Sequence, residues 1–166
     1  MILFLQNIFR FILLVTVQVL VLNNVQFLGY INPYIYILFI ISLPVQLNRH
    51  VTLLLGFLLG IIIDIFTNTP GLHAFATILI SYLRFGTIRL FTSIEEGSNP
   101  TPSFYTFGVS AYIKYVLTLV IIHHSTLFIL EAFSLIDIKL IFLKILLNSF
   151  VTILIILGIQ SFRKKW

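Results

Sequence analysis

The stretch that decides the fold is residues 55–66, Leu55-Gly56-Phe-Leu-Leu-Gly60-Ile-Ile-Ile-Asp64-Ile-Phe66. Gly56, Gly60 and Asp64 are spaced four residues apart, so on a helix they lie on one face. Two glycines on one face allow another helix to approach closely, and the other side chains of the stretch are large and apolar. A lone carboxylate in such a run must face protein or water rather than lipid. The stretch therefore predicts a helix packed inside a membrane-embedded bundle.

The composition extends this prediction to the whole chain. Of its 166 residues, 60% are hydrophobic and 9% are charged, and the mean hydropathy is +1.13. Such a chain has too little polar surface to cover a soluble globule. Because one membrane-spanning helix needs about 20 residues, about six helices use nearly the whole chain. We therefore expect an all-α membrane protein, a bundle of about six transmembrane helices that forms a single integral membrane domain over residues 1–166.

Turn residues and polar clusters divide the apolar sequence into expected spans. Asn32-Pro33 separates the first two spans, residues 48–50 separate the next two, and the turn at residues 67–71 follows the third. The second and third spans are short for a full crossing, and Pro44 interrupts the second. The expected spans are residues 8–28, 31–47, 51–66, 72–91, 105–130 and 138–161.

Basic residues predict the orientation of these spans. With six spans the two termini share one side, and the other side carries only Lys139 and Lys144. Short cytoplasmic connections of membrane proteins are enriched in lysine and arginine, so we expect both termini to be cytoplasmic. The formal net charge of +5 is then explained by topology and predicts no nucleic-acid binding. The basic residues on the side of the termini are Arg10, Arg49, Arg84, Arg89, Arg163, Lys164 and Lys165.

The polar residues expected near the outer side have two interpretations. The first is an outward-facing polar pocket or a partner contact. The second is a structural role for Asp64, either in an ion pair or beside the positive end of the fourth helix. The glycine pair also allows two interpretations, packing within the chain, or contact with a second copy of the chain or a partner helix. The polar-pocket candidates are Asp64, His73, His123, His124 and Lys144. The candidates for helix packing or partner binding are Gly56, Gly60, Asp64, Pro70, Gly71 and His73.

No residue pattern predicts catalysis or a bound metal. Asp64 is the only acid inside an expected span. A protease that uses two membrane-embedded aspartates sharing a proton is therefore excluded. The chain has no cysteine, and no two of its histidines are four residues apart on one helix face. We therefore expect a protein that is not an enzyme and that holds no metal and no cofactor. Tyrosines near the expected helix ends, among them Tyr34, Tyr36 and Tyr112, are expected to be interfacial anchors.

Residues 55–84 resemble a known family. The run from Leu55 to Phe66, the following Pro70-Gly71-Leu72-His73-Ala74-Phe75 and the later Ser81-Tyr82-Leu83-Arg84 resemble the rod shape-determining protein MreD. The chain length, the expected six-helix arrangement and the basic C-terminus are similar to that family as well.

The resemblance implies a non-enzymatic scaffold subunit of the bacterial cell-elongation complex, located in the cytoplasmic (inner) membrane. The implied partners are an MreC-like bitopic membrane protein and, through the wider complex, RodA with its class B penicillin-binding protein and the MreB filament. The lipid bilayer is the implied surrounding. An alternative from another class stays open, because the substrate-binding membrane subunits of small-solute (vitamin) transporters are similar in size and a polar outer pocket would suit a solute.

Overall fold

The protein is a bundle of long helices that run roughly side by side. The computed structural model describes residues 2–25, 31–93, 98–132 and 137–162. The elements are α1 (Ile2–Leu20), the 3-10 helix η1 (Leu22–Asn24), α2 (Ile37–Ile41), α3 (Arg49–Thr67), α4 (Leu72–Phe91), α5 (Phe104–Phe107), α6 (Val109–Glu131) and α7 (Ile138–Ser161). Within these described residues, five segments are long and apolar enough to cross a membrane, so the expected all-α membrane bundle is confirmed.

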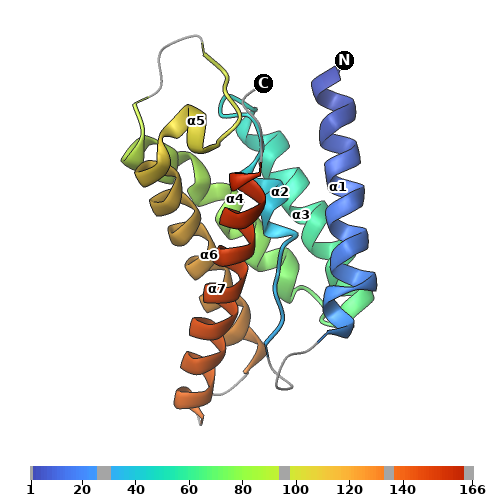
Figure 1. Ribbon diagram of the computed structural model, residues 1–166. Coiled ribbons are helices and arrows are strands. Elements are labelled where there is room, and N and C mark those ends of the chain that lie inside the picture. The colour runs from blue at the N-terminus through green and yellow to red at the C-terminus, as the bar shows by residue number, and fades with distance from the viewer. Residues whose placement is uncertain (1, 26–30, 94–97, 133–136, 163–166) are drawn as a thin grey trace.

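The five long segments are joined by a sixth passage of the chain that is not a long helix. After α1 the chain returns through the middle of the bundle as residues 31–48, with an extended part before the short helix α2 (Figure 1). We call this passage the central crossing. Every side chain from Ile35 to Leu43 is buried, so other parts of the protein surround it. Non-helical backbone at membrane depth requires such enclosure, because lipid cannot hydrogen-bond its amides.

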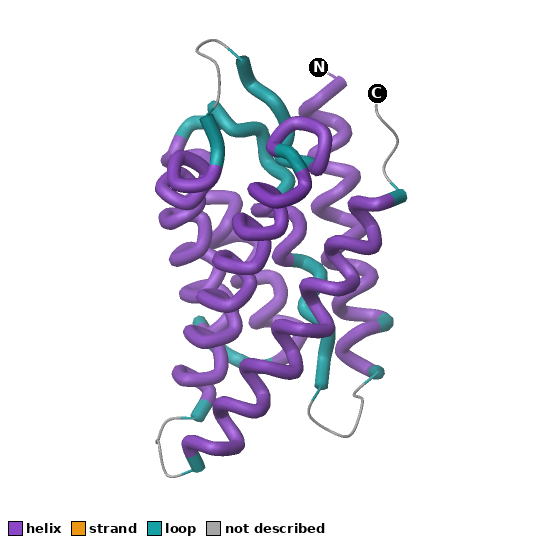
Figure 2. The backbone as a smooth tube through the Cα atoms, turned by 60° about the vertical axis from the view of Figure 1, so that its left-hand side comes forward, coloured by secondary structure: helices purple, strands orange, loops and turns teal. Residues whose placement is uncertain are grey.

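Because the chain passes along the bundle six times, α1 begins and α7 ends at the same end (Figures 1 and 2). We call this the terminal end, and it also holds the start of α3 and of α6 (Figure 1). The opposite end, here called the far end, holds the turn between α3 and α4 and the start of α7. Five long helices alone would place the two termini at opposite ends, so the central crossing restores the expected arrangement.

Helices α3 and α4 form a close hairpin. A Cβ added to Gly60 would lie 2.6 Å from the backbone nitrogen of Ala74, and one added to Gly56 would lie 3.0 Å from the carbonyl oxygen of Thr77. Only glycine permits this approach, so the glycine face lies against α4 of the same chain. The turn ends with Gly71 at φ 84°, a conformation that glycine adopts without strain.

Some of the expected span boundaries agree with the observed helices, and others do not. The expected spans 51–66, 72–91 and 138–161 agree with α3, α4 and α7 to within two residues. The expected span 31–47 is wrong as a helix, because Pro33 and Pro44 flank a segment in which only Ile37–Ile41 is helical. The expected span 105–130 contains a break at Gly108, where φ is 78° and α5 gives way to α6. Residues 26–28 of the first expected span and the basic residues 163–165 lie outside the described residues.

Candidate functional site

Asp64 is a buried cap for the helix that follows it. Its Oδ1 accepts hydrogen bonds from the backbone N–H of His73 at 2.9 Å and from the Thr69 hydroxyl at 3.0 Å. Its Oδ2 accepts a hydrogen bond from the backbone N–H of Ala74 at 2.9 Å. These amides belong to the first turn of α4, where helix N–H groups have no partner in the helix itself and a negative charge is favourable. The carboxylate therefore fastens the end of α3 to the beginning of α4, which agrees with the structural interpretation of this acid.

Tyr36 links two histidines across the middle of the bundle. Its hydroxyl lies 2.7 Å from Nδ1 of His73 on α4 and 3.0 Å from Nε2 of His123 on α6. A hydroxyl has one hydrogen to donate, so it donates to one histidine and accepts an N–H from the other. Nδ1 of His123 is buried and has no hydrogen-bond partner among the described residues. The central crossing is thereby tied to α4 and α6 through side chains.

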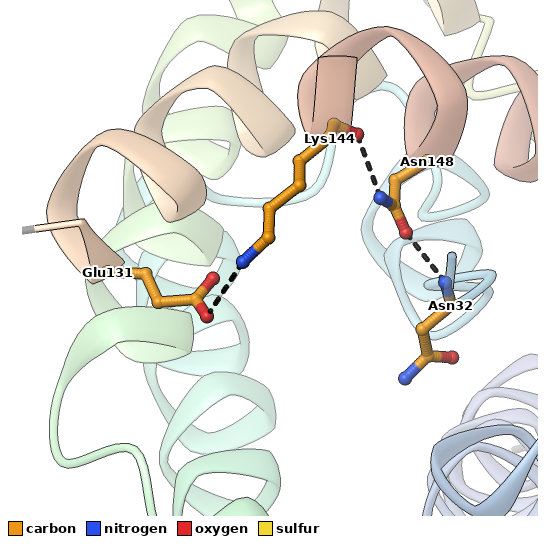
Figure 3. A network of polar contacts seen from close by, with 4 residues as sticks. All are labelled: Asn32, Glu131, Lys144 and Asn148. Carbon is orange, nitrogen blue, oxygen red and sulfur yellow. Dashed lines mark hydrogen bonds and ion pairs between the residues drawn. The ribbon is translucent and has the colours of Figure 1, made fainter. Parts of the chain in front are cut away.

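A second set of polar contacts holds the extended part of the central crossing to α7. The backbone N–H of Asn32 donates to Oδ1 of Asn148 at 2.7 Å, and the N–H of Tyr34 donates to the Thr152 hydroxyl at 3.0 Å. Asn148 donates in turn to the carbonyl oxygen of Lys144 at 2.8 Å (Figure 3). Side chains of α7 thus accept hydrogen bonds from the backbone N–H groups of this extended segment. In a β-sheet, a neighbouring strand would provide these acceptors.

The Thr152 hydroxyl also contacts His124, whose tautomer follows from its contact with the carbonyl oxygen of Val120. His124 Nδ1 lies 2.8 Å from the carbonyl oxygen of Val120, so it carries a hydrogen and donates it. Nε2 is then an acceptor, and the Thr152 hydroxyl lies 3.4 Å from it. Hydrogen bonds are therefore donated in one direction along this chain of contacts. The N–H of Tyr34 donates to Thr152, Thr152 donates to His124, and His124 donates to the Val120 carbonyl on α6.

At the C-terminal end of α2, side chains from three other helices donate hydrogen bonds to the backbone carbonyl oxygens of residues 41–44. Tyr115 on α6 donates to the carbonyl oxygen of Ile41 at 3.0 Å. Arg10 on α1 donates to the carbonyl oxygen of Ser42 at 3.1 Å. Arg84 on α4, which is fully buried, donates to the carbonyl oxygens of residues 43 and 44. The last carbonyls of a helix have no partner within it, so these three side chains remove a large cost of burying α2.

A cavity of about 330 Å³ lies at the far end of the bundle. We call it the far-end cavity. It borders the first turn of α4, the end of α6 and the beginning of the central crossing. Its lining is Val19, Asn23, Asn24, Asn32, Tyr34, Phe66, Thr67, Thr69, Leu72, His73, Leu127 and Glu131.

A neighbouring cavity of about 280 Å³ shares Glu131 with the far-end cavity. Lys144 lines this second cavity, and its Nζ lies 3.5 Å from Oε1 of Glu131 (Figure 3). The Glu131 side chain is 45% exposed, so the ion pair is open to the surroundings. The other residues of the second cavity are Phe128, Ala132, Asp137, Leu140 and Ile141.

The structure places the five residues of the expected polar pocket in different surroundings. Only His73 lines the far-end cavity, and Lys144 lines the neighbouring one. Asp64 is buried in its cap, and His123 and His124 are fully buried between helices. The expectation of one pocket lined by all five is therefore wrong, because Asp64, His123 and His124 make hydrogen bonds inside the bundle.

The candidate partner face also has a role within the chain. The groove formed by Gly56 and Gly60 is filled by α4, so it is not open to a partner helix. Pro70 and Gly71 are exposed in the turn at the far end, whereas His73 is buried. The tyrosine expectation is wrong for Tyr36 and Tyr112, which are fully buried.

Sequence reasoning missed the residues that bind the central crossing. They include asparagine, threonine and tyrosine side chains on helices whose amphipathic pattern is weak, so no local signal distinguishes them. The one available signal was the presence of several polar residues in the apolar runs 109–131 and 138–161, where burial requires a hydrogen-bond partner. The missed residues that bind the crossing are Tyr115, Asn148 and Thr152. Also missed were the roles of Asn32, Tyr34 and Tyr36 within the crossing itself and the pairing of Glu131 with Lys144.

These observations define the class of the protein, a multi-pass helical membrane protein with a polar interior around a non-helical crossing. The part of the chain that the structure describes contains no group of three or more His, Asp or Glu side chains arranged to hold a metal ion. Comparisons with protein-family models, with curated proteins and with solved structures found no match.

Proposed function

We propose that this chain is a non-enzymatic scaffold subunit of a bacterial cell-elongation complex, of the MreD type, in the cytoplasmic membrane. The observation that carries the proposal is the hairpin of α3 and α4. The residues behind the family resemblance, from Leu55 to Arg84, have structural roles in this one unit. The glycines permit the close approach, Asp64 caps α4 and Arg84 binds the end of α2. Such roles suit a protein that positions partners.

The distribution of basic residues supports the proposed orientation. Arg49 lies at the terminal end and Arg89 lies in the last turn of α4, whereas Lys139 and Lys144 lie in α7 toward the far end. By the positive-inside rule, the terminal end then faces the cytoplasm and the far end faces outward.

The partner surface in this proposal is an apolar groove between α1 and α3. The groove has a volume of about 310 Å³, and α1 is the least enclosed of the five long segments. Because the groove lies on membrane-crossing helices and is almost wholly apolar, its occupant is a transmembrane helix, as a bitopic MreC-like protein would provide. The lining is Asn7, Ile8, Phe11, Phe39, Leu43, Leu47, Val51, Leu55 and Leu58.

Co-purification with the MreC-like protein of the same genome tests the proposal. The two proteins are co-expressed, and the tagged chain is extracted in mild detergent. Leu58→Trp fills the groove and is expected to reduce the recovered partner about tenfold, whereas Leu146→Trp on α7 leaves it unchanged. Leu58 is 40% exposed and Leu146 is 52% exposed, so both substitutions face the membrane. If the unaltered chain retains no partner, the scaffold function is wrong; if both variants retain it, the groove is not the contact.

A second candidate function draws on the far-end cavity. A cavity of about 330 Å³ with several polar side chains is large enough for a small solute, as a substrate-binding subunit of a vitamin transporter requires. Uptake of radiolabelled vitamins by cells that express the chain, compared with cells that lack it, tests this alternative. Uptake without partner co-purification would favour the transporter subunit over the scaffold.

A further inference from the structure

Two exposed arginines lie at the terminal end of the α3–α4 hairpin. Arg49 is the first residue of α3, and Arg89 lies in the last turn of α4. Both residues are exposed, and neither forms an ion pair with another described residue. Because α3 and α4 are long enough to cross the membrane, their ends on this side lie at the level of the lipid headgroups.

The Arg49 guanidinium is held against a tyrosine of the neighbouring helix. Its Cζ lies 4.2 Å from the centre of the Tyr82 ring on α4, and Tyr82 is 52% exposed. This cation–π contact directs the Arg49 side chain across the hairpin, while the N–H groups at the edge of the guanidinium stay available. The planar guanidinium matches the oxygens of a phosphate.

Gly86 leaves open space between Tyr82 and Arg89 on the outer face of α4. The three residues are spaced four and three positions apart, so they lie on one side of the helix. Gly86 is exposed, and a Cβ added there would meet no atom within 4 Å. A ligand can therefore approach the backbone of α4 between an aromatic ring and a guanidinium.

The charge at the terminal end is positive in the part of the chain that the structure describes. The acidic residues of that part, Asp64, Glu131 and Asp137, all lie toward the far end. The two other acids of the chain, Glu95 and Glu96, lie outside the described residues. A ligand that complements two exposed arginines is negatively charged, and at the headgroup level of a membrane such a ligand is an anionic phospholipid.

We propose that Arg49, Tyr82, Gly86 and Arg89 form a binding site for one anionic phospholipid. The two guanidinium groups attract the negative headgroup, which occupies the open space over Gly86. The acyl chains then lie along the outer face of α4, where Phe75 is 55% exposed. This site goes beyond the scaffold function. None of its four residues lines the groove assigned to the partner helix, so failure of either proposal leaves the other standing.

Native mass spectrometry of the full-length protein in detergent tests this site. The protein receives either phosphatidylglycerol or phosphatidylcholine with the same acyl chains, and the fraction that retains one lipid is measured. We expect phosphatidylglycerol to bind at least about fivefold more tightly, because only its headgroup has a net negative charge. Glycerol phosphate, which has the phosphate but no acyl chains, is expected not to displace the bound lipid.

Four variants assign the effect to the site. Arg49→Gln and Arg89→Gln are each expected to weaken phosphatidylglycerol binding about fivefold. Gly86→Leu keeps both charges but fills the open space, so it is expected to weaken binding as well. Lys114→Gln is the matched control, because it removes one exposed positive charge toward the same end but on α6. We expect this control to bind phosphatidylglycerol as the unaltered chain does.

Three results would overturn the proposal. The first is equal retention of phosphatidylglycerol and phosphatidylcholine by the unaltered chain. The second is an equal effect of Lys114→Gln and the two arginine variants, since the response would then report net charge rather than a site. The third is displacement of the lipid by glycerol phosphate, which would identify a free phosphate as the ligand.

Discussion

The α3–α4 hairpin and the central crossing pass through the same bundle but satisfy their backbones in opposite ways. The hairpin relies on regular helices, close packing of glycines and a cap from Asp64, only nine residues before His73. The central crossing relies on side chains of distant helices, since Asn148 binds the backbone of Asn32 across 116 positions of sequence. The hairpin is therefore specified locally, whereas the crossing exists only when the rest of the bundle surrounds it.

The largest expected effect comes from breaking the hairpin at Gly60. In Gly60→Leu the new side chain meets the backbone of α4, which cannot move aside as a flexible side chain would. We expect a cost above the roughly 1–3 kcal/mol typical of overpacking and little monodisperse protein after extraction. Size-exclusion chromatography in detergent measures the outcome. Gly86→Leu is the matched control on α4, because an added Cβ there meets no atom within 4 Å.

A smaller effect is expected from removing the cap. Asp64→Ala leaves the backbone N–H groups of His73 and Ala74 and the Thr69 hydroxyl without their acceptor. We expect a loss of about 2–4 kcal/mol in the free energy of unfolding, measured by titration with a denaturing detergent. A loss below about 0.5 kcal/mol would show that the cap does not hold the hairpin together.

These two sites were the part of the molecule most accessible to sequence reasoning. The four-residue spacing of Gly56, Gly60 and Asp64 predicted a packed helix face, and the turn after Thr67 predicted where the next helix begins. The spacing alone left open whether α4 or another protein covers that face. Only the tertiary structure shows that α4 does.

The central crossing lay beyond sequence reasoning for a physical reason. Residues 31–47 are as apolar as a spanning helix, and Pro33 and Pro44 signalled a short or broken helix without indicating what replaces it. An extended chain can lie in a membrane only if other segments supply hydrogen-bond partners, and those partners are far away in sequence. Periodicity within a segment contains no information about Asn148 or Thr152.

A third variant separates the crossing from the hairpin. Thr152→Val keeps the shape of the side chain but leaves the N–H of Tyr34 without its acceptor, at an expected cost of about 1–3 kcal/mol. Thr126→Val is the control, because among the described residues the Thr126 hydroxyl bonds only to the carbonyl oxygen of Ile122 in its own helix. The same detergent titration should show a clear loss for Thr152→Val and almost none for Thr126→Val. Equal losses would mean that the extended backbone does not depend on α7.

The smallest effect is expected where one of several side chains at the end of α2 is removed. Tyr115→Phe deletes the hydrogen bond to the carbonyl oxygen of Ile41 while keeping the buried ring. We expect a loss of about 0.5–1 kcal/mol, since hydrogen bonds between membrane segments contribute modestly. Tyr82→Phe provides the comparison, because Tyr82 is 52% exposed and its ring against Arg49 is retained. No difference between the two variants would remove Tyr115 from the set of side chains that support the crossing.

Residues 31–48 cross the membrane although they form no long helix, and the sides on which their two ends lie test this crossing directly. The chain has no cysteine, so single cysteines report their side of the membrane without background. Val25→Cys and Asp137→Cys at the far end, and His50→Cys and Ser161→Cys at the terminal end, are treated with a membrane-impermeant maleimide on intact cells. We expect labelling of Val25→Cys and Asp137→Cys on intact cells, and labelling of His50→Cys and Ser161→Cys only after permeabilisation. Labelling of His50→Cys together with Val25→Cys on intact cells would contradict this crossing, because the chain would then re-enter at one side without crossing.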